Sequence, residues 1–200
     1  MPARLRLVLT ALTVCAAAAV VGVALAARQP AGGAGVENGW AGAIRPPGAA
    51  VPGFVLHDQD GRTVTSASLK GKPTVFAFIY STCQDTCPEQ VQTIRQALDD
   101  THADVNVVGV SVDPANDTPK RAKTFLLQQS MTGRMSFLLG TRAQLQPVWT
   151  AFGIRPQSSA LEHSAHVVLA DQAGMQRIGF PFDHLTPEGL GHDMAKLARR

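Results

Sequence analysis

The chain has 200 residues, which is enough for one domain with an appended segment. It carries 18 Lys and Arg against 15 Asp and Glu, but three of the basic residues, Arg4, Arg6 and Arg28, precede the first acid. The rest of the chain has 15 residues of each sign and no run of basic residues. A nucleic-acid-binding protein shows a clustered basic surface, so we expect no nucleic-acid partner.

An uncharged apolar stretch runs from Leu7 to Ala27. A run of roughly 20 apolar residues is long enough to cross a bilayer, and the arginines before it favour a cytoplasmic N-terminus and export of the remainder. We therefore predict that residues 1–28 anchor the chain in a bacterial-type cytoplasmic membrane, with the domain on the periplasmic or extracytoplasmic side. Because Ala24-Leu25-Ala26 resembles a cleavage site, a cleaved signal sequence is the alternative.

Residues 29–50 are rich in Gly, Ala and Pro and show no periodicity. This composition is typical of a flexible linker, so we predict that the folded domain covers residues 51–200. The domain opens with a predicted hairpin, in which residues 54–56 and 62–64 flank a turn at Asp60-Gly61.

A buried central strand is predicted from Thr74 to Tyr80, which is apolar on both faces. Pro88 fits the first position of the helix that follows, and Pro147 should kink a later helix or delay its start. The other predicted elements are a strand at 105–112, a helix around 122–126, a strand at 135–139, a helix over 145–152, a strand pair at 164–170 and 175–179, and a helix that opens at Thr186. This order predicts an α/β sandwich of thioredoxin type with a central mixed sheet.

Cys83 and Cys87 lie at the junction between the first buried strand and its helix, where thioredoxin-like proteins carry out their chemistry. The N–H groups and dipole of a helix start favour thiolates, which disulfide exchange and metal binding both require. The spacing is C-x3-C, whereas a disulfide oxidoreductase uses C-x2-C. A disulfide across so short a loop constrains the unfolded chain little, so a structural staple is a poor explanation. Two buried structural cysteines are the other alternative.

A thiolate pair suits a monovalent copper ion, and imidazole also suits copper as a third ligand. Of the six histidines, His163 and His166 lie at the start of the 164–170 strand, and in a thioredoxin-like fold the loop before that strand lies opposite the cysteines. We favour His163 because ligands concentrate on loops held by a rigid scaffold. His166 lies inside the strand, where it fills the core or faces solvent. The other four histidines are expected on the surface.

Four segments follow one another along the domain: Asp58-Gln59-Asp60-Gly61-Arg62, then Tyr80 to Pro88, then Val110 to Pro114 with Asp117-Thr118-Pro119, and finally Glu162-His163-Ser164. In order and spacing they resemble the Sco/SenC family, the copper-binding assembly factors of cytochrome c oxidase. The resemblance implies that Cys83, Cys87 and His163 are copper ligands. Gln84 departs from the family pattern, because many relatives have proline there.

The resemblance implies a metallochaperone that carries Cu(I), or alternatively Cu(II), to the binuclear copper site of a cytochrome c oxidase subunit. This is ligand exchange rather than enzymatic turnover, and another periplasmic copper carrier is a further partner. The alternative is a thiol–disulfide reductase, in which Cys83 and Cys87 are a redox pair that keeps the oxidase cysteines reduced. A peroxidase is disfavoured because Phe76 and Tyr80 occupy the positions of the proline and threonine of a peroxiredoxin site. For Asp113-Pro114, the sequence predicts mainly a turn, with contact to a partner or support of the metal ligands as the alternative.

Overall fold

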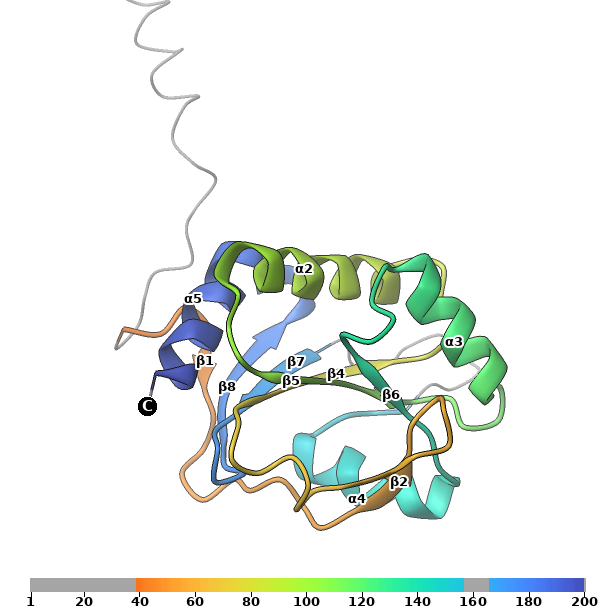
Figure 1. Ribbon diagram of the computed structural model, residues 1–200. Helices are drawn as coiled ribbons and strands as arrows, with labels where there is room; N and C mark the ends of the chain where they lie inside the picture. Colours follow the sequence, from red (N-terminus) through yellow and green to blue (C-terminus); the bar gives the residue numbers. More distant parts are fainter. Residues whose placement is uncertain (1–38, 157–165, 200) are drawn as a thin grey trace, which may run out of the picture. The chain divides into compact units, whose positions relative to one another are not determined.

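One six-stranded sheet organises the part of the chain that the computed structural model describes, residues 39–156 and 166–199. The strand order is β1-β8-β7-β4-β5-β6, and β2 pairs with β3 in a separate hairpin (Figure 1). The strands are β1 (Ala43–Ile44), β2 (Val55–His57), β3 (Thr63–Thr65), β4 (Thr74–Ile79), β5 (Asn106–Ser111), β6 (Ser136–Leu138), β7 (His166–Ala170) and β8 (Gln176–Pro181). The helices are α2 (Thr86–Thr101), α3 (Pro119–Gln128), α4 (Arg142–Phe152), the short η1 (Phe182–His184) and α5 (Pro187–Ala198).

The sheet is mixed, as predicted. β4, β5 and β6 run parallel, whereas β7 is antiparallel to both β4 and β8, and β1 is antiparallel to β8. All six residues of β4 are buried, which explains why this strand is apolar on both faces. The order of the elements confirms the predicted α/β sandwich of thioredoxin type with an N-terminal hairpin.

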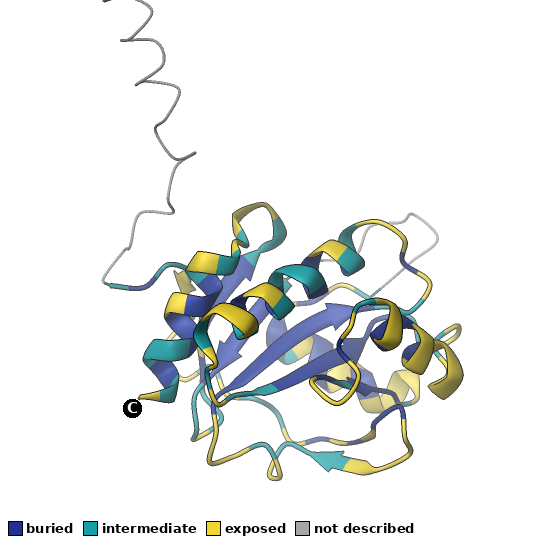
Figure 2. Ribbon diagram, turned by 45° about the horizontal axis from the view of Figure 1, so that its top comes forward, coloured by how far each residue is buried: buried dark blue, intermediate teal, exposed yellow. Residues whose placement is uncertain are grey.

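Both faces of the sheet are covered, and the alternation of side chains along β4 shows how. Val75, Ala77 and Ile79 pack with buried residues of α2, α3 and α5, whereas Phe76 and Phe78 pack with α4 and the hairpin. Figure 1 accordingly shows α2 and α5 on one side of the strands and α4 with β2 on the other. In Figure 2 the central strands of the sheet are buried, while the helices keep an exposed outer face.

Local sequence signals explain several element ends. Gly61 has a φ of 80°, and the Asp58 carboxylate accepts hydrogen bonds from the backbone N–H of Asp60 (2.8 Å) and Arg62 (2.9 Å). The Asp-Gly turn is therefore closed as predicted. At the other end of the domain, Thr186 caps α5 through its side chain, as its position before Pro187 predicted.

The structure corrects one prediction about proline and narrows another. Pro88 is the third residue of α2 rather than the first, because α2 begins at Thr86. This position is still in the first turn, where a backbone N–H would have no intrahelical partner, so the N–H that proline lacks costs the helix no hydrogen bond. Pro147 lies inside α4 and does not delay its start. Thr141 and Gln144 fix that start by a reciprocal capping box, with hydrogen bonds of 3.3 Å from the Gln144 N–H and 2.8 Å from the Thr141 N–H.

The folded domain begins before residue 51, so the predicted linker of residues 29–50 is too long. β1 pairs with β8, and Trp40 is buried. The buried carboxylate of Asp193 on α5 accepts hydrogen bonds from the N–H of Ala41 and of Gly42, both at 3.0 Å. The first described residues are thus held by a helix from the far end of the chain.

Membrane attachment concerns a part of the chain that the structure does not describe. The predicted anchor, residues 1–28, lies outside the described residues. Among the residues that are described, no helix is long and apolar enough to cross a membrane.

The hairpin covers one edge of the sheet. On the outer edge of β6, the Phe137 N–H donates to Gln59 Oε1 at 2.8 Å, and His57 and Leu139 exchange two backbone hydrogen bonds of 3.1 and 2.7 Å. An unpaired strand edge invites association with other chains. The segment from Asp58 to Arg62 therefore has a structural role beyond its turn.

Candidate metal centre

Cys83 and Cys87 meet at the start of α2. The loop that follows β4 carries Cys83, and Cys87 is the second residue of the helix. Asp85 is the N-cap residue, but its side chain makes no capping hydrogen bond. Instead, Cys83 Sγ accepts a hydrogen bond from the Cys87 N–H at 3.3 Å. A cysteine sulfur thus satisfies one of the N–H groups that a helix start leaves unpaired.

The two cysteines are thiols rather than a disulfide, and their acidities differ. Hydrogen bonds to Cys83 from the Cys87 thiol, from the N–H of Asp85 and of Cys87, and from the Tyr80 hydroxyl lower the pKa of Cys83 to about 4, against the opposing effect of burial. The hydrogen bond to the Cys83 sulfur, together with burial, raises the pKa of Cys87. Burial and the bond to Cys83 also raise the pKa of Tyr80. At neutral pH the pair therefore holds a thiolate at Cys83 and a proton on Cys87.

A half-buried carboxylate fixes the start of the cysteine loop. Asp117 Oδ1 accepts hydrogen bonds from the Ser81 N–H (2.7 Å) and the Ser81 hydroxyl (2.5 Å), and Oδ2 accepts one from the Ser111 hydroxyl (2.5 Å). Burial raises the pKa of Asp117, and the bonds from Ser111 and Ser81 oppose that rise. Because Ser111 ends β5, Asp117 joins the end of β5 to the loop that carries Cys83.

No role for Asp117 was predicted from the sequence. The only signal for it was its place in the Asp117-Thr118-Pro119 segment, directly before the N-cap of α3. Asp113-Pro114 does form the predicted turn, since the N–H groups of Asn116 and Asp117 donate to the Asp113 carbonyl at 3.1 and 2.9 Å. This turn brings the Asp117 carboxylate to the cysteine loop.

The structure describes only one of the two candidate histidines. His163 lies outside the described residues, which stop at 156 and resume at 166. His166 is the first residue of β7. Side chains alternate along a strand, and Val168 packs with α4 and the hairpin, so His166 faces away from the layer that holds the cysteines. Burial and the nearby charge of Arg45 lower the pKa of His166. The geometry supports leaving His166 out of the metal site.

The described residues supply two of the three predicted ligands. Among them, no group of three or more His, Cys, Asp or Glu side chains is placed to hold a metal ion. The pair of Cys83 and Cys87 nevertheless provides two soft donors, which suit Cu(I) better than they suit a hard cation such as Mg²⁺. Binding through both sulfurs requires Cys87 to lose its proton.

Comparison with known proteins now places this arrangement in a family. Residues 43–199 match the family model described as SCO1/SenC. The chain belongs to the SCO1/SenC family. The matched region contains both cysteines, His163 and the four segments on which the resemblance was based, so the predicted family is confirmed.

Individual SCO1/SenC relatives agree with this assignment. A SCO1 protein homolog of Bacillus subtilis is 36% identical over 75 residues, which are 36% of this chain and 39% of that protein. Protein SenC of Rhodobacter capsulatus is 34% identical over 102 residues, which are 50% of this chain and 45% of that protein. The chain thus spans less than half the length of these two relatives. The structure of Bradyrhizobium japonicum ScoI with copper bound is 31% identical, covers 74% of this chain and 99% of that chain, and superposes with a TM-score of 0.61.

Proposed function

We propose that this chain is a copper metallochaperone for the assembly of cytochrome c oxidase. It binds Cu(I), or alternatively Cu(II), through Cys83, Cys87 and His163, and transfers the ion to the binuclear copper site of an oxidase subunit. The observation that carries the proposal is the preformed pair of sulfur donors at the start of α2. Support comes from the relative ScoI, which is solved with copper bound. The oxidase as acceptor, and another periplasmic copper carrier as donor, follow from the family resemblance.

The protonation of the pair governs how the ion enters and leaves. The Cys83 thiolate presents one ready donor, and Cys87 releases its proton when the second sulfur binds the ion. Because the pKa of Cys87 is raised, this thiol regains its proton when the ion leaves. Transfer of the ion to an acceptor whose thiols are already deprotonated is therefore favoured over its return to the carrier site, where Cys87 must lose a proton again. The transfer needs no turnover of a small substrate.

The proposed place of action is outside the cytoplasmic membrane. The stretch from Leu7 to Ala27 would hold the chain in the bilayer, with Arg4 and Arg6 on the cytoplasmic side. The domain would then meet its acceptor on the other side of that membrane. That compartment is oxidising, so the state of the two thiols is itself a relevant variable.

The difference in acidity between the cysteines also favours a second function, thiol–disulfide reduction. The Cys83 thiolate would attack a disulfide of the acceptor, form a mixed disulfide and release one acceptor thiolate. Cys87, after losing its proton, would attack the Cys83 sulfur, form the Cys83–Cys87 disulfide and release the second acceptor thiol. Two electrons pass from the pair to the acceptor, and no metal takes part.

Copper titration of histidine variants separates the two functions. The reduced full chain is titrated with Cu(I) against a chromophoric Cu(I) chelator, and the complex is examined by X-ray absorption spectroscopy. We expect a one-to-one complex in the wild type, its loss in His163→Ala, and its retention in the matched control His166→Ala, because His166 faces the other side of the sheet. Reduction of a model disulfide should survive in both variants.

Oxidase assembly in cells completes the test. Under the carrier proposal, His163→Ala abolishes assembly of the copper site, and added copper restores it in part. Retention of stoichiometric copper binding and of oxidase assembly by His163→Ala would show that the carrier proposal is wrong. Assembly that needs both cysteines but tolerates His163→Ala would favour the reductase.

A further inference from the structure

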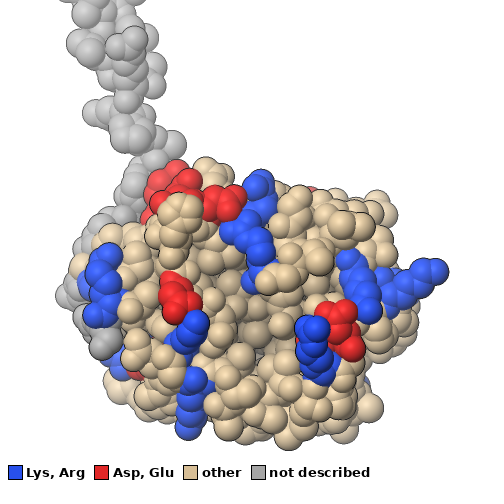
Figure 3. Space-filling model, in the orientation of Figure 1, with Lys and Arg blue, Asp and Glu red and all other residues tan. Residues whose placement is uncertain are grey.

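A groove of about 490 Å³ lies beside Cys83, between the cysteine loop and α3. Cys83 and Gln84 line it on the loop side, and Lys120, Arg121 and Thr124 line it on the α3 side. None of its described lining residues is acidic. Figure 3 shows Lys and Arg side chains projecting from the side of the molecule where Figure 1 places α3. The entrance to the thiolate therefore has a positive wall.

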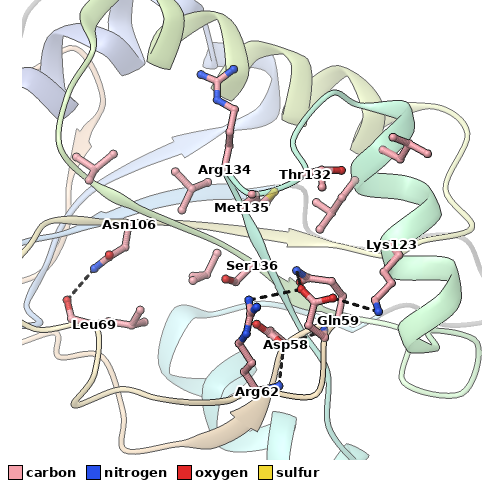
Figure 4. A pocket seen from close by; sticks show the side chains of 17 residues that line it. Asp58, Gln59, Arg62, Leu69, Asn106, Lys123, Thr132, Arg134, Met135 and Ser136 are labelled. Atoms are coloured by element: carbon pink, nitrogen blue, oxygen red, sulfur yellow. Dashed lines mark hydrogen bonds and ion pairs between the residues drawn. The ribbon is translucent and has the colours of Figure 1, made fainter.

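A larger cavity of about 550 Å³ lies on the other side of α3 and provides a contrast. Two of its basic residues share one carboxylate, because Lys123 and Arg62 lie 3.1 and 3.7 Å from the oxygens of Asp60. In Figure 4, Arg62 and Lys123 converge from the hairpin and from α3. In the groove beside Cys83, by contrast, Lys120 and Arg121 form no ion pair with any carboxylate of the described residues. Arg121 donates one hydrogen bond to the Asn116 carbonyl at 2.8 Å, which leaves its charge without a carboxylate, and the charges of both residues are available to a partner.

The positions of these two cations work against the stability of α3. Thr118 caps the helix by accepting a hydrogen bond from the Arg121 N–H at 3.3 Å, so Lys120 and Arg121 are its second and third residues. The positive end of the helix dipole disfavours cations there. Glutamate or glutamine at the third position would complete a capping box, as Gln144 does in α4.

The other described helices follow the expected pattern. α2 and α5 each carry a glutamate in the first turn, and α4 has its capping box. Among the four described α-helices, only α3 places two cations and no acid or glutamine in its first turn, and it is the helix whose start borders the groove beside Cys83. Arg121 has one local role, because its guanidinium donates to the Asn116 carbonyl at 2.8 Å. Helix stability accounts neither for Lys120 nor for the pairing of two cations at this position, so the pair points to binding.

We propose that the groove between the cysteine loop and α3 binds an extended, acidic segment of the protein that accepts copper from Cys83. This inference rests on the proposed carrier function. Carboxylates of the acceptor would pair with Lys120 and Arg121, and Gln84 would exchange hydrogen bonds with its backbone. The Thr124 hydroxyl, which donates to the Lys120 carbonyl at 3.0 Å, would accept one from a backbone N–H. Opposite charges across an interface orient the partner and raise the association rate, so the acceptor's ligands would arrive next to Cys83.

The length of the groove fits a peptide segment. Lys120 and Gln128 both line it, and eight residues of an α-helix span about 12 Å. Three to four residues of an extended chain cover about the same distance. The buried ring of Phe125 contributes an apolar part of the lining. A short extended segment can therefore lie along α3 from the thiolate outwards.

The test uses a charge reversal that does not endanger folding. In the full chain, Lys120→Glu with Arg121→Glu places acids at the start of α3, where they favour the helix. This gain offsets the loss of the exposed hydrogen bond from Arg121 to the Asn116 carbonyl, so the thermal midpoint should stay close to that of the wild type. The matched control is Lys70→Glu with Arg142→Glu, which makes the same change in charge. Lys70 lies before β4, at the end opposite the cysteine loop, and Arg142 begins α4 on the other face of the sheet.

The probes are two synthetic peptides of equal length, each with one cysteine held in a mixed disulfide with thionitrobenzoate. Glutamates flank the cysteine in one peptide, and lysines flank it in the other. The Cys83 thiolate attacks the peptide sulfur, and thionitrobenzoate leaves as a coloured thiolate whose release gives the rate. At low salt, two added ion pairs should make the glutamate peptide react about tenfold faster than the lysine peptide, and high salt should reduce this ratio.

The ratio of the two rates decides the matter, because it cancels any change in the reactivity of Cys83 itself. The groove variant should lose or reverse the preference, and the control should keep it. Equal rates for the two peptides in the wild type, or the same ratio in the groove variant and the control, would overturn the proposal. The proposal would also be overturned if the reaction rate of glutathione disulfide changed between the variants as strongly as that of the glutamate peptide. The groove would then serve a small anionic disulfide.

Cu(I) titration of the same variants separates this inference from the function on which it rests. The groove variant should bind one Cu(I) like the wild type. If the wild type binds one Cu(I) but reacts with the glutamate and lysine peptides at equal rates, only the groove proposal is wrong. If the wild type prefers the glutamate peptide but forms no defined copper complex, the carrier function is wrong, and so is the copper acceptor proposed as the occupant of the groove.

Discussion

Replacing Asp117 by alanine tests whether the link to β5 holds the cysteine loop in place. The substitution removes the acceptor of three hydrogen bonds. The hydroxyl of Ser111 is fully buried and would lose its partner, which costs about 1–3 kcal/mol. Ser81 is half-exposed and can turn to water, so it adds about 1 kcal/mol at most. Removal of a half-buried charge offsets part of this cost, and we expect the free energy of unfolding to fall by about 2 kcal/mol.

Asparagine at position 117 is the matched control. It keeps an oxygen for Ser81 and an amide that can donate to Ser111, and it cannot ionise. The pKa of Asp117 is raised in the folded protein, so the stability that its protonated form provides is complete below the unfolded pKa and is lost as pH rises through the folded pKa. Asp117→Asn should therefore become more stable relative to the wild type as pH rises through that range.

Urea unfolding, followed by tryptophan fluorescence, measures both variants, and Cu(I) competition measures the site. Groups that orient metal ligands typically contribute 10- to 100-fold in affinity, so Asp117→Ala should bind Cu(I) about tenfold more weakly, with Asp117→Asn close to the wild type. If Asp117→Ala unfolds at the same urea concentration as the wild type and binds copper equally well, Asp117 does not position the loop.

Three further predictions concern other contacts. Cys87→Ala removes the largest cause of the low pKa of Cys83. With a pKa of about 4, the wild type should react with iodoacetamide at a rate that is flat between pH 6 and 8, whereas the rate of the variant should rise with pH; a flat profile in the variant would contradict this. Asp193→Ala leaves two N–H groups without their acceptor and should lower the free energy of unfolding by about 3 kcal/mol, with Trp40 fluorescence shifted to the red; an unchanged spectrum would count against the clamp. Gln59→Ala exposes the edge of β6, and we expect a loss of about 1–2 kcal/mol and faster aggregation, as monitored by light scattering.

The predicted parts of the fold are those whose signals are local. β4 could be predicted because burial on both faces leaves a continuous apolar run, and α5 because its cap and first turn are contiguous in sequence. β1 could not be predicted. It has two exposed residues, and its place depends on β8 and on the Asp193 carboxylate, both more than 130 residues away. A segment without its own periodicity shows its structure only through such distant contacts.

The same division applies to the site. Cys83 and Cys87 were predictable because a strand, a short loop and a helix start are all visible around them. The acceptor that fixes this loop, Asp117, is 36 residues from Ser81, and no spacing rule connects the two. His166 was set aside from its place inside a strand, and the structure gives the stronger reason that it faces the layer of α4. The assignment of His163 as a ligand stays a prediction, because that residue lies outside the described part of the chain.

The two proposed functions, copper transfer and disulfide reduction, share one demanding step at this site, the loss of the proton from Cys87. The hydrogen bond that makes Cys83 a thiolate at neutral pH is the one that holds this proton in place. A partner that occupies Cys83, either as a metal ion or as a mixed disulfide, removes the hydrogen bond to the Cys83 thiolate that raises the pKa of Cys87, and so releases the second sulfur. The chemistry of the first bond at Cys83 thus determines which reaction follows. Selection between the two functions therefore depends on what reaches Cys83, and the positive wall formed by Lys120 and Arg121 lies on that path.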